Sequence, residues 1–217
     1  MKIAIFGTSG FSHEVADICA ASGYKNIVLI KKPSEVIRSS KFMILDESNV
    51  NSLLDEGYKF IIGIGDNRIR KEISGRYQYL PFTNVIHPTA SFGLNQRDYI
   101  EKKTGNIIAA GVRFTNEIII GNFGIYNLNC TIGHDCFIQD HVNICPGANV
   151  SGNVTILKES FIGTNACIIN GQSSTCRITI GEKTTIAAGA VVVRDVPNGA
   201  TVMGVPAREV REDERLA

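Results

Sequence analysis

The sequence lacks the features that mark a membrane protein, a nucleic-acid binder or a zinc finger. Its 217 residues carry 22 basic and 21 acidic side chains, so the formal net charge is +1 and no basic cluster stands out for nucleic acid or a membrane surface. No apolar run is long enough to span a bilayer, and the apolar segment in MKIAIFGTSG is too short for a signal peptide. The six cysteines include no CxxC pair and no zinc spacing. These absences predict a reduced, cytoplasmic protein with no membrane span, no nucleic-acid partner and no metal.

Helical and alternating patterns are also scarce after about residue 107, where apolar residues instead recur every six positions. Fourteen of the fifteen positions are apolar: Ile108, Phe114, Ile120, Tyr126, Ile132, Ile138, Ile144, Val150, Ile156, Ile162, Ile168, Ile180, Ile186 and Val192, with Ser174 as the exception. The positions two before each of these are mostly small or β-branched, which predicts a three-residue strand and a three-residue turn in each hexad. A period of six is typical of a parallel β-helix, in which three hexads close one triangular coil. The run predicts about five coils.

The beginning of the chain has a different pattern. The segment MKIAIFG predicts a strand, Gly7 to Phe11 predicts a loop, and Glu14 to Ala21 has apolar residues at helical spacing. A strand, a glycine loop and a helix open a nucleotide-binding α/β unit, where backbone N–H groups at the helix start suit a phosphate.

The dinucleotide fingerprint of such units is incomplete here. Of the pattern GxGxxG only Gly7 and Gly10 are present, and the second predicted strand, 26–30, is followed by Lys31 and Lys32 instead of an acidic residue for a ribose. Two lysines suit a phosphate better than a hydroxyl, and a solvated loop is the alternative interpretation. The pattern favours a sugar nucleotide over NAD.

A further strand is predicted over residues 59–64, followed by Gly65, Asp66 and Asn67. Because ligands of open parallel sheets bind beyond the carboxyl ends of the strands, we expect residues 65–67 to face the same crevice as Ser9 and Phe11. The alternative for Asn67 is a helix N-cap.

Near residue 84 the pattern changes, which predicts a boundary between an α/β domain at residues 1–84 and a β-helix domain at residues 85–217. His87 precedes a proline, and we expect it to be structural. The polar stretch 94–105 predicts an exposed loop. The break at Ser174 follows Asn170 to Ser173, which predicts a distorted turn.

One hexad carries a candidate catalytic pair. In IGHDC, His134 and Asp135 fall in a turn, where adjacent side chains can meet, and a carboxylate on one imidazole nitrogen makes the other a better base. Asn127 lies in the preceding turn and His141 in the following one. Gly152 is one coil away from His134, so its missing side chain leaves space for a substrate, unless it marks a backbone with positive φ.

These motifs together resemble those of a known enzyme family. The hexads with IGHDC and CPGANVSGNV, the loop FGTSGF, the strand end IGIGDN, the boundary IHPTA and the final GVPA cover nearly the whole chain. The sequence resembles the sugar O-/N-acetyltransferases with a left-handed β-helix, which include nucleotide-aminosugar N-acetyltransferases and sialic acid O-acetyltransferases. The resemblance implies a Rossmann-like domain that holds the nucleotide sugar, followed by a left-handed parallel β-helix of hexapeptide repeats. It also implies a homotrimer, with acetyl-CoA in the groove between two helices.

The resemblance also implies roles for particular residues. The catalytic residues would be His134 as base and Asp135 as its orienting acid. The substrate-binding residues would be Ser9, Gly10, Phe11, Asp66, Asn67 and Asn127, and the acetyl-CoA-binding residues Gly152, Thr164, Ala188 and Gly189. To these sets we add Lys31 and Lys32 as substrate-binding residues and Asn143 as an acetyl-CoA-binding residue. Two places depart from the family pattern, because Asn143 stands where a second His is frequent and Lys31-Lys32 where an acidic pair is frequent.

The hypothesis is therefore acetyl transfer from acetyl-CoA to the amine of a nucleotide-linked amino deoxysugar, without a metal. The nearest alternative is O-acetylation of a sugar hydroxyl, for example of sialic acid. A zinc hydratase that uses His87, His134 and His141 across a trimer interface is a second alternative. A non-catalytic nucleotide-sugar sensor is a third.

Overall fold

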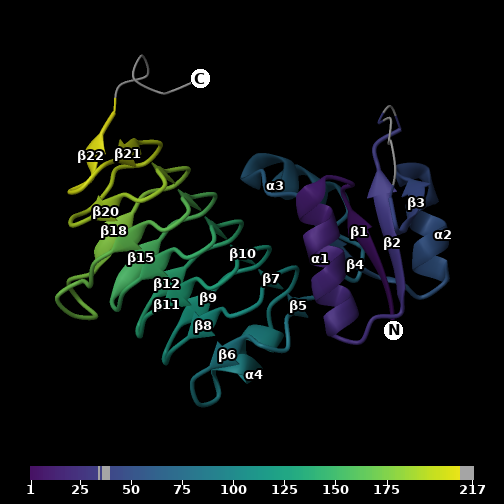
Figure 1. Ribbon diagram of the computed structural model, residues 1–217, viewed down its shortest axis with the longest axis horizontal. Helices are drawn as coiled ribbons and strands as arrows, with labels where there is room; N and C mark the ends of the chain where they lie inside the picture. The colour runs from purple at the N-terminus through teal and green to yellow at the C-terminus, as the bar shows by residue number, and fades with distance from the viewer. Residues whose placement is uncertain (34, 36–39, 211–217) are drawn as a thin grey trace.

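A computed structural model describes residues 1–33, 35 and 40–210, which form an α/β unit followed by a stack of short parallel strands (Figure 1). The α/β unit has a parallel sheet with the strand order β3-β2-β1-β4. Its strands are β1 (Lys2–Phe6), β2 (Asn26–Lys31), β3 (Met43–Asp46) and β4 (Lys59–Ile62). Its helices are α1 (Gly10–Ala21), the 3₁₀ helix η1 (Glu47–Asn49), α2 (Val50–Asp55) and α3 (Asn67–Arg76).

The two faces of this sheet are covered by different parts of the chain, because alternate residues of a strand point to opposite sides. Ile3 and Ile5 belong to a buried cluster that includes α1 and the stacked strands, whereas Ala4 and Phe6 pack in a second cluster with α2 and α3. Helix α1 therefore lies between the sheet and the stack (Figure 1). The predicted strand, loop and helix at the start of the chain are confirmed, with α1 beginning at Gly10 instead of Glu14. Strand β3 and helix α2 were not predicted.

From Val85 to Glu209 successive strands belong in turn to three sheets, and we call this part of the chain the coil stack. The first sheet contains β5 (Val85–Ile86), β7 (Ile107–Ile108), β10 (Ile125–Tyr126), β13 (Asn143–Ile144), β16 (Phe161–Ile162), β19 (Thr185–Ile186), β21 (Thr201–Met203) and β22 (Arg208–Glu209). The second contains β6 (Ser91–Phe92), β8 (Arg113–Phe114), β11 (Thr131–Ile132), β14 (Asn149–Val150), β17 (Cys167–Ile168) and β20 (Val191–Val192). The third contains β9 (Ile119–Ile120), β12 (Phe137–Ile138), β15 (Val154–Ile156) and β18 (Ile178–Ile180).

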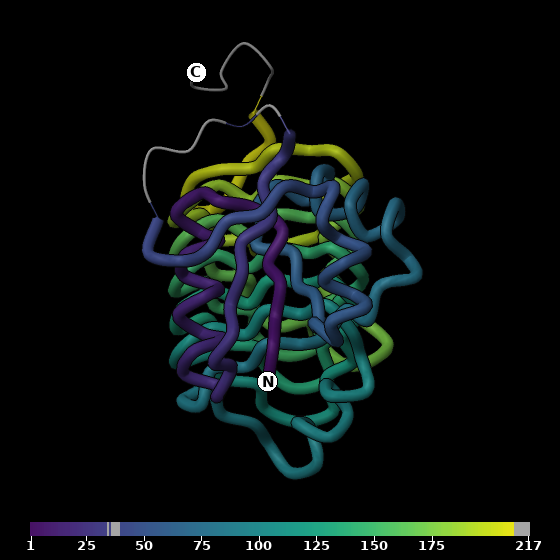
Figure 2. The backbone as a smooth tube through the Cα atoms, turned by 90° about the vertical axis from the view of Figure 1, so that its right-hand side faces the viewer, coloured from purple at the N-terminus to yellow at the C-terminus, as the bar shows by residue number. Residues whose placement is uncertain are grey.

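The strands of each sheet pair in parallel, except β21 with β22, and the paired residues follow the predicted repeat. Thr131 pairs with Asn149 and Ile132 with Val150, which places three hexads in one coil. Figure 2 shows the coils stacked behind the α/β unit, whose strands run along the stacking direction. The arrangement is consistent with a parallel β-helix.

The hexad repeat is also present in the backbone of the turns. A non-glycine residue with a left-handed backbone, φ between 54° and 62°, recurs at multiples of six positions: Glu117, Phe123, Asn129, Asp135, His141, Asn153, Glu159, Asn165 and Lys183. Few non-glycine residues adopt this conformation. Its recurrence shows that these turns share one backbone geometry.

The core of the stack consists of the inward residues of the hexads, as predicted. Ile132, Ile138 and Ile144 are almost fully buried, and so are Cys130 and Cys136. Burial raises the pKa of the Cys130 thiol to about 12, so this side chain stays protonated and packs as a small apolar group.

The break at Ser174 lies in a turn that contains extra residues. Ile138 pairs with Ile156 at the usual spacing, but Ile156 pairs with Ile180, so this coil is longer by a whole hexad than the regular coil before it. Ser174 is exposed in the extra residues and does not replace a core residue. The predicted distorted turn is confirmed, since Gly171 lacks the left-handed backbone of the equivalent turn residues. Its cause is an insertion one hexad long, which leaves the phase of the repeat unchanged.

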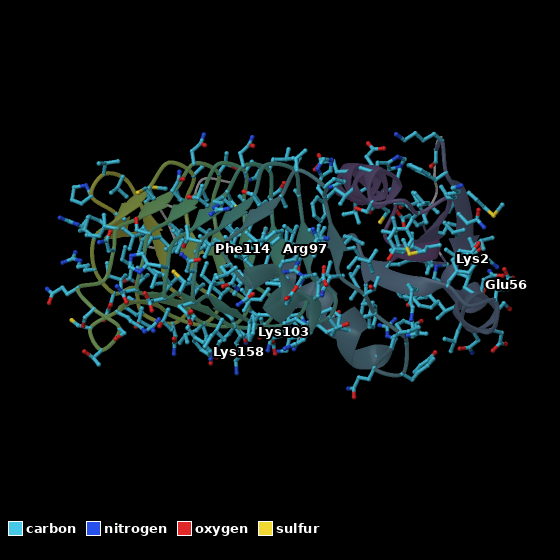
Figure 3. The ribbon with its side chains drawn as sticks, turned by 90° about the horizontal axis from the view of Figure 1, so that it is seen from below. Lys2, Glu56, Arg97, Lys103, Phe114 and Lys158 are labelled. Atoms are coloured by element: carbon cyan, nitrogen blue, oxygen red, sulfur yellow. The ribbon has the colours of Figure 1, made fainter. Side chains whose placement is uncertain are left out.

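The predicted exposed loop at 94–105 was wrong, since it contains helix α4 (Gln96–Glu101). Ile100 is fully buried, and the buried Gln96 side chain bonds the backbone of Ile118 through its Nε2 donor at 2.7 Å and its Oε1 acceptor at 3.0 Å. This helix covers the end of the stack. Its Arg97 lies over the ring of Phe92, which stacks on Phe114 of β8, and Figure 3 labels Arg97 and Phe114. Only Gln96 and Ile100 of this short helix are buried, so the polar composition of the stretch does not reveal that it packs on the stack.

Among the described residues, no helix is long and apolar enough to cross a membrane.

Candidate active site

The His134 and Asp135 side chains meet in the turn between β11 and β12. Nδ1 of His134 lies 2.7 Å from Oδ2 of Asp135, and both side chains are partly exposed. The turn is held in the stack because Asp135 N donates to Asn116 O at 3.1 Å and His134 O accepts from Asn153 N at 2.9 Å. With Nδ1 facing the carboxylate, the Nε2 atom is left to accept a proton from a nucleophile.

Gly152 lies directly against the His134 ring, one coil away. A Cβ atom at residue 152 would lie 2.5 Å from Nε2 and 2.6 Å from Cε1, so the imidazole itself fills the place of the missing side chain. The expectation of open space for a substrate at this point was therefore wrong. Gly152 does not have a positive φ either, so the backbone alternative fails as well. The glycine is required because the ring packs onto its backbone.

Phe11 and Asn127, two of the predicted substrate-binding residues, line one cavity of about 200 Å³ between α1 and the first sheet of the stack. Asn127 Oδ1 accepts a bond from Leu128 N at 2.7 Å. His87 lines the same cavity, and its Nδ1 contacts Thr89 Oγ1 at 2.8 Å within its own turn, which fits the structural role we expected.

Ser9, Lys31 and Lys32 line a different crevice, of about 290 Å³, at the carboxyl ends of β1, β2 and β4. Lys31 Nζ lies 2.9 Å from Asp46 Oδ1, so its charge already has a carboxylate partner. Lys32 is exposed, and Gly10 begins α1 at the edge of this crevice. The helix start and Lys32 are therefore the groups best placed for a phosphate.

Asp66 and Asn67 lie in a third cavity, of about 590 Å³, together with Asn143. The expectation that they share a crevice with Ser9 and Phe11 does not hold, because the chain after β4 turns toward the coil stack. Asp66 Oδ1, not Asn67, caps helix α3 by accepting from Ile69 N at 2.9 Å.

Two amide side chains fasten this loop to the stack. Asn67 Nδ2 donates to Glu159 O at 2.9 Å and to Ser160 O at 3.0 Å. Asn143 Nδ2 donates to Gly65 O at 3.0 Å, and Asn143 is nearly buried. Both residues therefore position the loop while they line the cavity.

Arg70 is a buried residue that the sequence analysis did not single out. Its guanidinium is fully buried and donates to Phe123 O at 2.8 Å, Ile64 O at 3.1 Å and His141 O at 2.9 Å, and also to Gly65 O and Asn67 Oδ1. Burial lowers its pKa to about 10, so it remains charged at neutral pH. Arg70 therefore joins the α/β unit to the stack. Its place on the buried face of α3, three residues before Ile73, was the available signal.

His141 contributes to the same junction. Its Nε2 lies 2.9 Å from Ser74 Oγ, and its ring stacks on Phe123 with the centroids 5.3 Å apart. Burial, reinforced by the charge of Arg70, lowers its pKa to about 4. The imidazole is therefore neutral at neutral pH and packs between the two parts of the chain.

The residues predicted to bind acetyl-CoA do not come together within one chain. Thr164, Ala188 and Gly189 are exposed and stacked on the edge after the first sheet, where Gly189 N donates to Thr164 O at 2.8 Å. Gly152 lies beside His134 on the edge after the second sheet. Within the described residues there is no group of three or more His, Cys, Asp or Glu side chains that could hold a metal ion.

A parallel coil stack with a His and Asp pair in an exposed turn, joined to an α/β unit with a crevice at its strand ends, has the organisation that the sequence predicts for an acyltransferase. Residues 2–77 match the PglD N-terminal domain. The chain is 30% identical to GDP-perosamine N-acetyltransferase of Escherichia coli O157:H7. The matched region covers 95% of this chain and 95% of that enzyme. The chain belongs to the family of sugar acetyltransferases.

Two solved structures extend this comparison. The acetyltransferase domain of PglB from Neisseria gonorrhoeae, in complex with acetyl coenzyme A, has a TM-score of 0.84 and 32% identity, covering 96% of this chain and 98% of that one. PerB from Caulobacter crescentus, in complex with CoA and GDP-perosamine, has a TM-score of 0.81 and 26% identity, covering 97% of this chain and 98% of that one.

Proposed function

We propose that this enzyme transfers acetyl from acetyl-CoA to the amine of a nucleotide-linked amino deoxysugar. The observation that carries the proposal is the His134 and Asp135 pair, 2.7 Å apart, in an exposed turn of a chain whose α/β unit has a crevice beside a helix start. Two relatives support the amine as acceptor. One is a GDP-perosamine N-acetyltransferase, and the other, PerB, was solved in complex with CoA and GDP-perosamine.

In the proposed mechanism His134 acts as general base in one direct step. The amine attacks the thioester carbonyl, a C–N bond forms, the C–S bond breaks, and Nε2 takes the amine proton and returns it to the departing thiolate. Asp135 stabilises the imidazolium through Nδ1. The Gly152 N–H polarises the thioester oxygen; it has no acceptor among the described residues.

The nucleotide part of the acceptor is proposed to bind the α/β unit. Ser9, Gly10 and Lys32 supply an N–H-rich helix start and an exposed ammonium for the diphosphate. Phe11 and Asn127 line the neighbouring cavity, which suits the less polar deoxysugar ring. We place the boundary of this domain at residue 84, because β5 from residue 85 already pairs within the first sheet of the stack.

Acetyl-CoA is proposed to bind between two copies of the chain. Gly152 and the group of Thr164, Ala188 and Gly189 lie on different edges of one stack, so a groove that uses all of them needs a second stack alongside. A homotrimer of left-handed parallel β-helices in the cytoplasm provides three such grooves, in which one edge of each chain faces the other edge of its neighbour.

The test is an acetyl-transfer assay with UDP-, GDP- and dTDP-linked aminosugars, each paired with the matching hydroxysugar. We expect CoA release with at least one aminosugar and none with its hydroxysugar, and we expect His134→Asn to lower kcat by roughly two to four orders of magnitude. Transfer to the hydroxysugars would establish O-acetylation instead. Nucleotide binding without turnover would establish a sensor, and stoichiometric zinc needed for activity would establish a hydratase-like site.

A further inference from the structure

One coil of the stack carries a hexad that the fold does not need. Ile156 pairs with Ile180 and not with a residue one ordinary coil away. The extra residues, 172–177, form a hairpin in which Gln172 N donates to Cys176 O at 2.9 Å and Ser173 bridges Cys176 in antiparallel fashion. We call them the 172–177 hairpin, which projects from the stack beside β18 (Figure 1). Without it, the coil would have the same length as the coil before it.

The hairpin leaves and rejoins the stack at the turn that packs against His134. Just before the hairpin, Gly171 N donates to Gly152 O at 3.0 Å. Just after it, Ile178 N donates to Asn153 O at 3.2 Å. A Cβ atom at residue 171 would lie 2.8 Å from Arg177 Cα, so the two ends of the hairpin are close together. The insertion therefore adds residues at the candidate active site while the coils above and below keep their register.

Arg177, the last residue of the hairpin, reaches across this turn to the catalytic pair. Its Nη1 donates to the main-chain oxygen of Asp135, and its Nε donates to Ser174 O at 3.0 Å. Asp135 has a left-handed backbone, with φ of 58°, and its N–H is held by Asn116 O. Arg177 thus holds the carbonyl side of the same residue whose carboxylate contacts His134 at 2.7 Å.

We propose that Arg177 is a positioning residue for acetyl transfer, and that the 172–177 hairpin serves to present it. The inference rests on the proposed function of His134 and Asp135. A charged donor on the Asp135 carbonyl fixes the orientation of that peptide, and therefore the direction of the carboxylate that aligns the imidazole. Among the described residues, the only side chains that form hydrogen bonds with Asp135 are His134, through the carboxylate, and Arg177, through the main-chain oxygen.

The experiment measures kcat and both KM values for the parent enzyme and for Arg177→Ala, Arg177→Lys and His134→Asn. A misdirected base lowers the rate without weakening binding, so Arg177→Ala should lower kcat roughly ten- to a hundredfold and leave both KM values within about threefold. Arg177→Lys keeps the positive charge but loses the planar fork that reaches two carbonyl oxygens, so it should restore part of the rate. Methylguanidine added to Arg177→Ala should also restore activity, but it should not restore His134→Asn. Arg97→Ala removes an exposed arginine of α4 and is the matched control, expected to equal the parent.

A deletion of residues 172–177 tests the hairpin separately. The deletion returns the coil to the length of the one before it. We therefore expect the deletion variant to have the melting temperature of the parent and the kcat of Arg177→Ala. The inference is overturned if the parent is active, His134→Asn is inactive, and Arg177→Ala or the deletion keeps kcat within about twofold of the parent. A rise in either KM with unchanged kcat makes Arg177 a binding residue and overturns it equally. A parent that acetylates no nucleotide aminosugar overturns the proposed function along with it.

Discussion

The Nε2 atom of His134 lies 2.5 Å from the point where a Cβ atom of residue 152 would be. The three atoms nearest to that point all belong to the imidazole, and the backbone of Gly152 lies outside the left-handed region. An alanine at 152 is therefore compatible with the backbone but not with the present position of the ring. The two residues depend on each other through this contact.

We predict that Gly152→Ala displaces the imidazole from Asp135 and lowers kcat by roughly a hundredfold, because small misplacements of a catalytic group are costly. A double-mutant cycle with His134→Ala measures the coupling. Alanine at 152 should lower the melting temperature in the parent and have little effect once the ring is removed. Equal losses in both backgrounds would show that the glycine serves the backbone and not the ring.

Arg70 should be essential to the junction between the α/β unit and the stack. Arg70→Met keeps much of the volume but leaves several buried carbonyl oxygens without a donor, which we expect to cost about 3 kcal/mol or more in the free energy of unfolding. Denaturant titration measures this loss. Arg97→Met, which removes an exposed ion pair with Glu101, should cost at most about 1 kcal/mol. Similar losses in the two variants would contradict the assigned role of Arg70.

His141 should make the folded protein less stable as the pH falls. Its pKa in the folded protein is about 4, below the ordinary 6.5, because of burial and the nearby Arg70. The unfolded chain therefore binds a proton first, and stability is lost as the pH falls from about 6.5 toward 4. The Coulombic effects of Asp140 and Glu159 oppose this shift, and that of Lys71 adds to it.

His141→Gln removes the titrating group, so the melting temperature of this variant should depend less steeply on pH between those two values. Thermal unfolding at a series of pH values measures the two slopes. Identical slopes for the variant and the parent would assign the acid sensitivity to other groups.

The two lysines after β2 should contribute unequally to binding of the nucleotide sugar. Lys32→Ala removes an exposed ammonium and should raise KM for the acceptor roughly tenfold, the effect of one charge-assisted hydrogen bond to a phosphate. Lys31→Ala should have a smaller effect, because its ammonium is paired with Asp46 at 2.9 Å. Steady-state kinetics at constant ionic strength compares them, and a larger effect at Lys31 would reverse the assignment.

The sequence predicted those features that depend on local repetition. The hexad period identifies the stack because the same inward position recurs in every coil, and the adjacency of His134 and Asp135 follows from their place in one turn. The order of strand, loop and helix at the start of the chain is equally local. Each of these inferences needs only residues that are close in sequence or separated by whole repeats.

The features that escaped prediction depend on contacts between distant segments. Arg70 and Arg177 donate to main-chain oxygens. Every residue has such an oxygen, so the sequence does not show which one a distant arginine will contact. The 172–177 hairpin stayed hidden because its length equals the repeat. The separation of Asp66 and Asn67 from Ser9 follows from the docking of a loop on the stack, which strand order alone does not reveal.

The central claim is that His134 accepts the proton of a sugar amine during acetyl transfer. Its most direct test is the single-turnover rate of acetyl transfer to a nucleotide-linked aminosugar, with mass analysis of the product, for the parent and for His134→Asn. We expect an N-acetylated product from the parent and a rate at least about a hundredfold lower in the variant. A variant rate within about threefold of the parent, or an acetyl group found on a hydroxyl oxygen, would contradict it.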